Sequence, residues 1–245
     1  MVTRAELNEY KRGQQTIDAL VRRDLNQAWT ALGAIDPFVK RDLLLDITPG
    51  LVSTYGPVAA SLAAEFFTET TGLAATIPAA AAAEAVEAST RAVIGGLWTG
   101  DDLGARDRLA DSLIRHTRRH GRATIRESVG TNRDRVRFAR ILSYASKKGP
   151  CSWCRILASR GAVYHSKITA GGLDDWHDGC ACDAVAVRSP DDFPTGVAGY
   201  DEIDIHPDTG AWIPAPLFDE YAQVHEYGDN DRDVATKMRA KYGYT

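Results

Sequence analysis

Hydrophobic residues recur at three- and four-residue steps along the first part of the chain, a spacing that predicts amphipathic helices. The first is expected from residue 4 to about 30, and Gly33 ends it. Asp36 and Pro37 are suited to the N-cap and first turn of a second helix. Thr48, Pro49 and Gly50 are expected to break or kink that helix. The apolar positions of the first helix are Leu7, Tyr10, Ile17, Leu20, Val21, Leu25, Ala28 and Leu32.

The pattern continues to about residue 146 without a convincing strand. A third helix is expected over about 51–70, and Gly72 closes it. Pro78 precedes an alanine-rich stretch, which predicts a helix over about 79–98 because alanine has the highest helix propensity. Two further helices are expected over 102–129 and 132–146.

The helix over 102–129 is predicted to place its apolar and basic residues on opposite faces. Leu103, Leu109, Leu113 and Ile125 are among those expected to face the core, and the arginines are expected to face outward. His116 and His120 lie one turn apart, a spacing that suits a metal. On an arginine-rich face, however, we expect both to be solvated.

Beyond Pro150 the helical period gives way to short, glycine-rich pieces. These predict one or two helical turns over 154–159, strands over 161–164 and 181–187, a loop over 169–172 and mostly irregular chain over 189–216. A last helix is expected from about 217 to 241, interrupted at 228–230. The fold class expected is a mainly α helical domain over 1–148, a small α+β, zinc-knuckle-like metal-binding module over 149–190, and an acidic, Pro/Gly-rich segment with a C-terminal helix over 191–245.

Composition places the chain among ordinary globular proteins. It has 245 residues, 44% hydrophobic and 25% charged. Neither a signal peptide nor a membrane span is expected, because no sufficiently long apolar run occurs. Four clustered cysteines in a chain of this size and without a leader argue against a disulfide framework.

Charge is strongly divided along the chain. Residues 104–150 contain 13 basic and 4 acidic residues, a net charge of +9, whereas residues 174–233 contain 2 basic and 16 acidic residues, a net charge of −14. One interpretation is that these charges are solvated or pair with each other. The other is that the basic block binds nucleic acid or an acidic partner. The candidates for that role are Arg115, Arg118, Arg119, Arg122, Arg126, Arg133 and Arg137.

All four cysteines lie in two short motifs that suit a metal. Cys151 and Cys154 form a C-x2-C turn, and His177, Cys180 and Cys182 form H-x2-C-x-C about 25 residues later. Five candidates compete for four positions, and we favour Cys151, Cys154, His177 and Cys180 as ligands of a structural Zn²⁺ ion. Cys182 would be a substitute ligand or a buried thiol. Buried reduced thiols without metal, or a disulfide, remain the alternatives.

Enzyme interpretations of the same motif are weaker. The sequence Pro150-Cys151-Ser152-Trp153-Cys154 matches half of a zinc deaminase signature, but the required H-x-E is absent from the sequence. Four protein ligands would also leave no open position for a water molecule. A cysteine nucleophile, Cys151 with His177 as base, is conceivable, although thiols at this spacing are more simply ligands. We therefore expect no enzymatic activity.

Several stretches resemble the MuF-like minor capsid or head-morphogenesis proteins of tailed phages, especially phages of actinobacteria. The specific part is CxxCxxLxxRG from Cys151 to Gly161 together with HxxCxC from His177 to Cys182. Residues 36–42 and 51–67 add to it, and the resemblance covers roughly residues 10–190.

The resemblance implies a structural virion protein made early in head assembly. It would lie in the capsid interior, after assembly in the host cytoplasm, near the portal vertex. Expected partners are the portal protein, the major capsid protein or both, and packaged DNA through the basic residues, with neither a membrane nor a small-molecule substrate. The alternatives are a DNA-binding module acting through helices 102–146 and a hydrolase, either a maturation protease or a nuclease effector.

Overall fold

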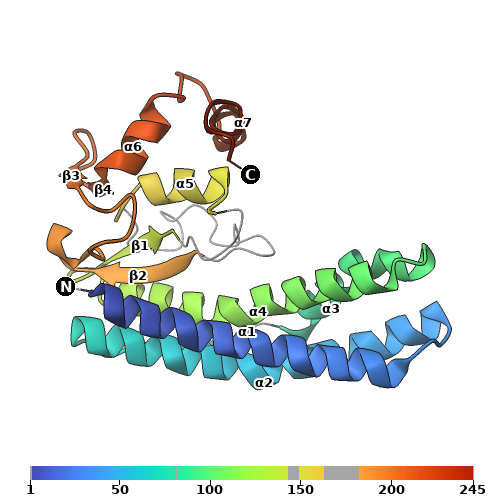
Figure 1. Ribbon diagram of the computed structural model, residues 1–245. Coiled ribbons are helices and arrows are strands. Elements are labelled where there is room, and N and C mark those ends of the chain that lie inside the picture. The colour runs from blue at the N-terminus through green and yellow to red at the C-terminus, as the bar shows by residue number, and fades with distance from the viewer. Residues whose placement is uncertain (1, 81, 143–148, 163–181, 245) are drawn as a thin grey trace.

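Three long helices lie side by side along one half of the molecule (Figure 1). They are α1 (Arg4–Leu32), α2 (Pro37–Thr71) and α4 (Asp102–Thr131), in a computed structural model that describes residues 2–80, 82–142, 149–162 and 182–244. The shorter α3 (Ala83–Val93) and the 3₁₀ helix η1 (Ile94–Trp98) pack against α2 and α4. The prediction of a mainly helical chain is confirmed.

The helix ends follow local rules that the sequence already displays. Thr3 and Glu6 form a capping box at the start of α1, and the Asp36 carboxylate accepts hydrogen bonds from two backbone N–H groups at the start of α2. Gly72 ends α2 in the left-handed conformation, with φ +68°. These residues therefore set the boundaries of α1 and α2 where the pattern predicts them.

Of the break or kink predicted at Thr48, Pro49 and Gly50, the break does not occur. The helix runs without interruption through Pro49 and Pro57. Each proline removes one backbone donor, a local cost that normally kinks or ends a helix. Here α2 packs against α1, α3 and α4 along its length, so burial of its apolar face outweighs the missing hydrogen bonds.

The alanine-rich helix is shorter than predicted. It begins at Ala83 and gives way to η1 at Ile94. Residues before it run in non-helical conformation beside α4, where the backbone N–H of Thr76 donates to the Ser128 hydroxyl at 2.8 Å. Tertiary contacts of this connection therefore outweigh the helix propensity of its alanines.

The prediction of a helix over 132–146, and of no strand before 146, is also wrong. Strand β1 (Arg137–Ile141) pairs antiparallel with β2 (Asp183–Val187), with Ala139 opposite Val185. A short apolar run fits a buried strand as well as a helix, and only its partner decides between them. The alternation expected in β2 does not occur, because all five residues are buried between the helical bundle and the chain above (Figure 1).

The remaining elements cover the β1–β2 pair (Figure 1). They are listed in chain order as α5 (Ser152–Ser159), η2 (Pro190–Asp192), β3 (Ile203–Ile205), β4 (Trp212–Pro214), α6 (Ala215–Ala222) and α7 (Asp231–Tyr242). The predicted helical turns after Cys151 and the interruption of the last helix are confirmed. Ala162 forms a bridge with Trp212, whereas residues 163–164 and the loop expected over 169–172 lie outside the described residues.

One hydrophobic core joins the bundle to the β1–β2 pair. It contains residues of α1, α2 and α4, both strands and two cysteines. A second core fills the opposite end of the bundle, and a third joins α5 to α7. The division into three parts at residues 148 and 190 stays a prediction. Among the described residues, no helix combines the length and apolar character of a membrane span.

Candidate functional site

The first cysteine motif forms the start of α5. Gly149 has φ +67°, a conformation that suits glycine, and Cys151 is the N-cap residue of the helix. The Cys151 Sγ atom accepts a hydrogen bond from the backbone N–H of Cys154 at 3.3 Å. Two thiols three positions apart on one turn can bind the same metal ion. The C-x2-C turn therefore has a geometry suited to chelation.

The second motif reaches the same core from a distant part of the chain. Cys182 directly precedes β2 and is 1% exposed, and Cys154 is 2% exposed. Both belong to the core shared by the bundle and the strands, and the half-buried Cys151 packs against it. The Cys182 carbonyl accepts a hydrogen bond from Arg122 Nη2 at 3.1 Å.

The described cysteines supply the right donors but do not complete a metal site. Thiols from two segments, surrounded by apolar side chains, have the chemistry of a structural zinc site. Within the described ranges, however, His, Cys, Asp and Glu residues form no group of three that could hold a metal. His177 and Cys180 lie outside the described residues, so the favoured set of ligands stays a prediction.

Most of the seven candidate arginines for nucleic-acid binding are engaged within the protein. Arg118 binds the Asp18 carboxylate, with Nε 3.0 Å from Oδ2, and Arg122 is buried. Arg137 lies over the Trp212 ring at 4.2 Å, and Arg126 pairs with its neighbour Glu127. Arg115 Nη2 is 3.3 Å from the Ser89 hydroxyl. Arg119 and Arg133 are exposed, and a role of the seven arginines in nucleic-acid binding stays a prediction.

A layer of charged and polar side chains lies where α1 meets α4 and β2. Besides the Asp18–Arg118 pair, Lys11 Nζ is 3.6 Å from Asp183 Oδ2. Burial, and secondarily the Asp183 carboxylate, raise the pKa of the Tyr10 hydroxyl far above its ordinary value. Tyr10 is therefore a neutral group at any physiological pH. Through the pair of Lys11 with Asp183, this layer connects the helical bundle to β2, the strand that follows Cys182.

The expectation that His116 and His120 are solvated is wrong. They are 3% and 8% exposed, and His116 Nε2 is 2.8 Å from the Ser89 hydroxyl on α3. The His120 ring lies against Gly56, where an added Cβ would be 2.7 Å from the ring. The glycine on α2 makes room for the imidazole. His116 and His120 follow Leu109 and Leu113 at steps of three and four residues, so the periodicity of α4 already places both histidines on its buried face.

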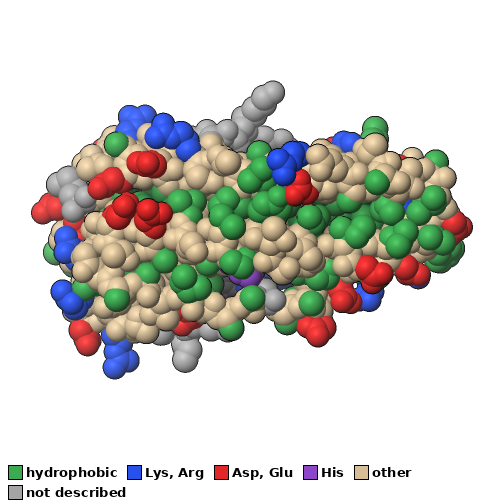
Figure 2. Space-filling view, turned by 90° about the horizontal axis from the view of Figure 1, so that it is seen from below, with side chains coloured by type: hydrophobic (Ala, Val, Ile, Leu, Met, Phe, Trp, Pro, Cys, Tyr) green, Lys and Arg blue, Asp and Glu red, His purple; other side chains and the backbone are tan. Residues whose placement is uncertain are grey.

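Large hydrophobic side chains are exposed at the end of the bundle farthest from β1 and β2. We name this group the apolar tip. Its centre is Phe38 against Trp98, with ring centroids 5.8 Å apart, and Leu103, predicted to face the core, is 64% exposed. Figure 2 shows hydrophobic side chains gathered toward this end, bordered by acidic ones. The tip comprises Ile35, Phe38, Val39, Leu43, Trp98 and Leu103.

Comparison with known proteins identifies the family. A family model described as VG15 protein matches residues 1–206, which is most of the chain. The chain belongs to the VG15 protein family. This is a family of phage proteins, so the protein is a phage protein. No curated protein and no solved structure matches the chain.

The VG15 match includes most of the features described above. The helical bundle, the apolar tip, both cysteine motifs and the β1–β2 pair lie within residues 1–206. Strand β4 and helices α6 and α7 follow the matched range. The VG15 family thus defines the origin of the protein, and its specific role has to be argued from its surfaces.

Proposed function

We propose that the protein is a minor structural component of the phage head, a MuF-like capsid protein that docks on the portal protein inside the capsid. Membership of a phage family and the resemblance carried by CxxCxxLxxRG and HxxCxC support this role. The observation that carries it is the apolar tip, because a contiguous exposed patch of large hydrophobic residues usually marks a protein interface.

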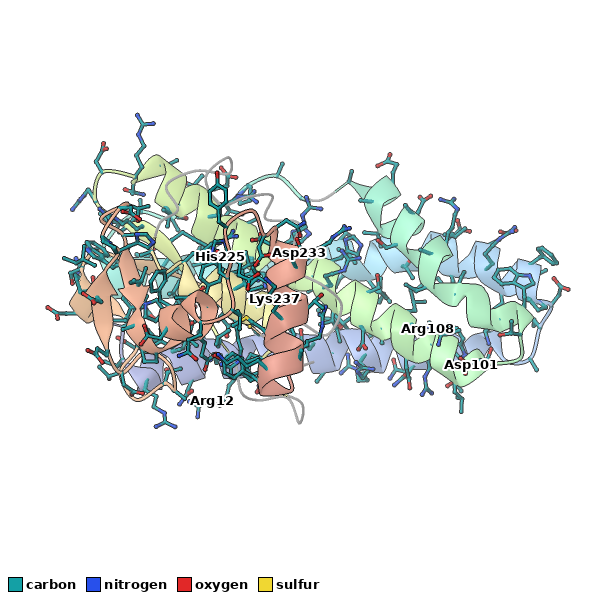
Figure 3. All side chains as sticks on the ribbon, turned by 90° about the horizontal axis from the view of Figure 1, so that it is seen from above. Arg12, Asp101, Arg108, His225, Asp233 and Lys237 are labelled. Atoms are coloured by element: carbon teal, nitrogen blue, oxygen red, sulfur yellow. The ribbon has the colours of Figure 1, made fainter. Side chains whose placement is uncertain are left out.

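The tip also indicates the chemistry of its partner. Its aromatic centre, Phe38 with Trp98, is of the kind that dominates binding energy at protein interfaces. The surrounding carboxylates are more exposed than the guanidinium groups: Asp42 is 62% exposed, whereas its partner Arg41 is 34% exposed. Asp101 and Arg108 lie at the same end, paired at 3.1 Å (Figure 3). The complementary surface on the portal protein would be apolar with a basic rim.

The docking surface can be tested by substitutions in its centre. Phe38→Ser combined with Leu103→Ser removes two exposed hydrophobic side chains without opening a core. We expect the affinity for purified portal protein to fall about tenfold or more, as measured by calorimetry, and incorporation into particles to fall with it. Ile205→Ser with Tyr227→Ser is the matched control, since these residues are 60% and 105% exposed elsewhere.

Two outcomes would contradict the proposal. Equal losses from the tip and control variants would mean that the tip has no special role. Binding to the major capsid protein, with none to the portal protein, would replace the proposed partner.

A structural zinc ion is the second part of the proposal. Cys151 and Cys154 would chelate it, with two of His177, Cys180 and Cys182 completing four ligands. A bound ion would stabilise the segment between β1 and β2, which connects the bundle to the upper layer of the molecule.

A further inference from the structure

A pocket of about 550 Å³ opens at the turn between α1 and α2. Its volume is in the range of binding sites for small organic groups in proteins. Ile35 belongs both to the wall of this pocket and to the apolar tip, so the pocket is continuous with the proposed docking surface. The apolar part of the wall is formed by Trp29, Ala34, Ile35, Pro37 and Leu97.

A half-exposed carboxylate supplies the polar part of the wall. Asp102 Oδ1 accepts a hydrogen bond from Lys40 Nζ at 2.8 Å, and Asp102 Oδ2 accepts one from the Trp29 indole at 2.8 Å. The Lys40 side chain is 5% exposed, whereas that of Asp102 is 50% exposed. Each carboxylate oxygen can accept a second hydrogen bond. Asp102 therefore presents accessible acceptor atoms to a group that enters the pocket.

The charges of the pocket cancel. Burial opposes ionisation of Asp102, but the hydrogen bonds from Lys40 and Trp29 outweigh it and lower the pKa of the carboxyl. Lys40 and Asp102 are the charged residues among those that line the pocket, and they form an ion pair. A second cation would be repelled by the Lys40 ammonium, and an anion would be repelled by the Asp102 carboxylate. The electrostatic complement of this pocket is a neutral group.

The occupant also needs a hydrogen-bond donor. A purely apolar group would remove the Asp102 carboxylate from water without replacing its hydrogen bonds, which is costly. The indole of tryptophan combines a large apolar ring with one neutral N–H group that only donates. Tryptophan is also frequent among the residues that dominate the binding energy of protein interfaces.

We propose that this pocket receives a tryptophan side chain of the portal protein. The ring would pack against Pro37 and Leu97, and the indole N–H would donate to Asp102. This inference rests on the docking function proposed above, and it adds the residue type by which the partner is anchored beside the apolar tip.

Binding of an indole can be tested on the full-length protein alone. The probe is 5-fluoroindole, followed by ¹⁹F NMR, and its signal should shift saturably with a dissociation constant of about 1 mM or below. The compound 1-methyl-5-fluoroindole should bind about tenfold more weakly, since it lacks the donor for Asp102. No saturable shift up to about 5 mM, or equal affinity for the two compounds, would overturn the proposal.

Two variants locate the binding site. Ala34→Phe should fill the pocket and abolish binding of 5-fluoroindole. Ala31→Phe is the matched control, because Ala31 is exposed at the end of α1 and is not part of the lining, and it should leave binding unchanged. Retained binding in Ala34→Phe, with helicity intact by circular dichroism, would also overturn the proposal.

A second measurement, with purified portal protein, separates this inference from the proposed function. Ala34→Phe should lower the affinity for portal protein about tenfold or more, and Ala31→Phe should not. An unchanged affinity in Ala34→Phe, while Phe38→Ser with Leu103→Ser still impairs docking, would overturn the role of the pocket and leave the proposed function standing. Absence of portal binding by the unmodified protein would refute both proposals.

Discussion

Gly56 shows how one side chain, or its absence, determines the contact between two helices. It lies within α2, where glycine lowers helix stability, yet an added Cβ would be 2.7 Å from the His120 ring. Gly121 is similar, because an added Cβ there would be 2.9 Å from the Ala59 carbonyl oxygen. These glycines allow α2 and α4 to approach closely and bury His120 between them.

The first prediction at this scale concerns Gly56→Ala. The methyl group would displace the imidazole, and we expect the free energy of unfolding to fall by about 1–3 kcal/mol, as measured by urea denaturation. Gly50→Ala in the same helix is the control. An added Cβ at Gly50 meets nothing within 4 Å, so helix propensity alone should raise stability by about 0.5–1 kcal/mol. Equal changes in the two variants would refute the steric account.

At the scale of elements, the C-terminal helices are held by charges near the turn between them. Lys237 of α7 donates to both Asp229 oxygens, at 2.8 and 3.1 Å, and to Glu226 at 2.6 Å. Figure 3 shows α7 lying across the molecule with Lys237 facing this turn. The hydrogen bond from Lys237, and then that from the Glu226 backbone N–H, lower the pKa of Asp229. The folded state thus favours the ionised carboxylate.

The lowered pKa of Asp229 predicts that the stability of α7 depends on pH. The pKa of Asp229 is lower in the folded state than in the unfolded state. Its contribution to the free energy of unfolding is therefore complete above the unfolded pKa. That contribution is lost as the pH falls through the lower, folded pKa. The buried Met238 methyl signal should report loosening of α7 in that range. Asp229→Asn should weaken α7 at neutral pH and flatten the acid response, and the exposed Asp208→Asn should do neither. An unchanged response in Asp229→Asn would disprove the assignment.

Elements were predicted from sequence where local rules decide them. Asp36, Gly72 and Asp101 are caps, and the helices next to them begin or end as expected. The errors lie where distant contacts compete with local preference. Pro49 is retained inside α2 because the helix packs against α1, α3 and α4. The run around Phe138 is a strand because β2, far along the chain, pairs with it and it is buried.

For the whole molecule, the decisive feature is the core shared by the bundle, the strands and the cysteines. β1 precedes the first cysteine motif and β2 follows the second, so their pairing closes the segment between them. A metal bound inside that segment would stabilise it independently of the bundle.

Metal content is therefore the prediction at this scale. Purified protein should contain about one zinc ion per chain, lost in Cys151→Ser with Cys154→Ser. A chelator should then reduce the tertiary signal of Trp153 while the helicity of the bundle persists. Zinc should restore the signal and magnesium should not, since magnesium prefers oxygen ligands. A folded, metal-free segment with an unchanged Trp153 signal would refute the zinc proposal.

The candidate site was predictable only in part. The cysteine motifs are visible in sequence because the ligand spacing is local, and the three cysteines that the structure describes lie on one core. The ion pairs of the basic residues could not be predicted from the sequence, since the partner of Arg118 is Asp18, 100 positions away. The apolar tip was missed for the same reason: Leu103 has the period of a core residue, but its side chain is 64% exposed.

Sequence alone determined the helical character of the chain, most of its helix ends and the grouping of its thiols, because each depends on residues a few positions apart. Tertiary structure decided the strand β1, the internal pairing of the arginines and the exposure of the tip. These depend on which distant surfaces meet, and burial there outweighs local propensity and charge pattern.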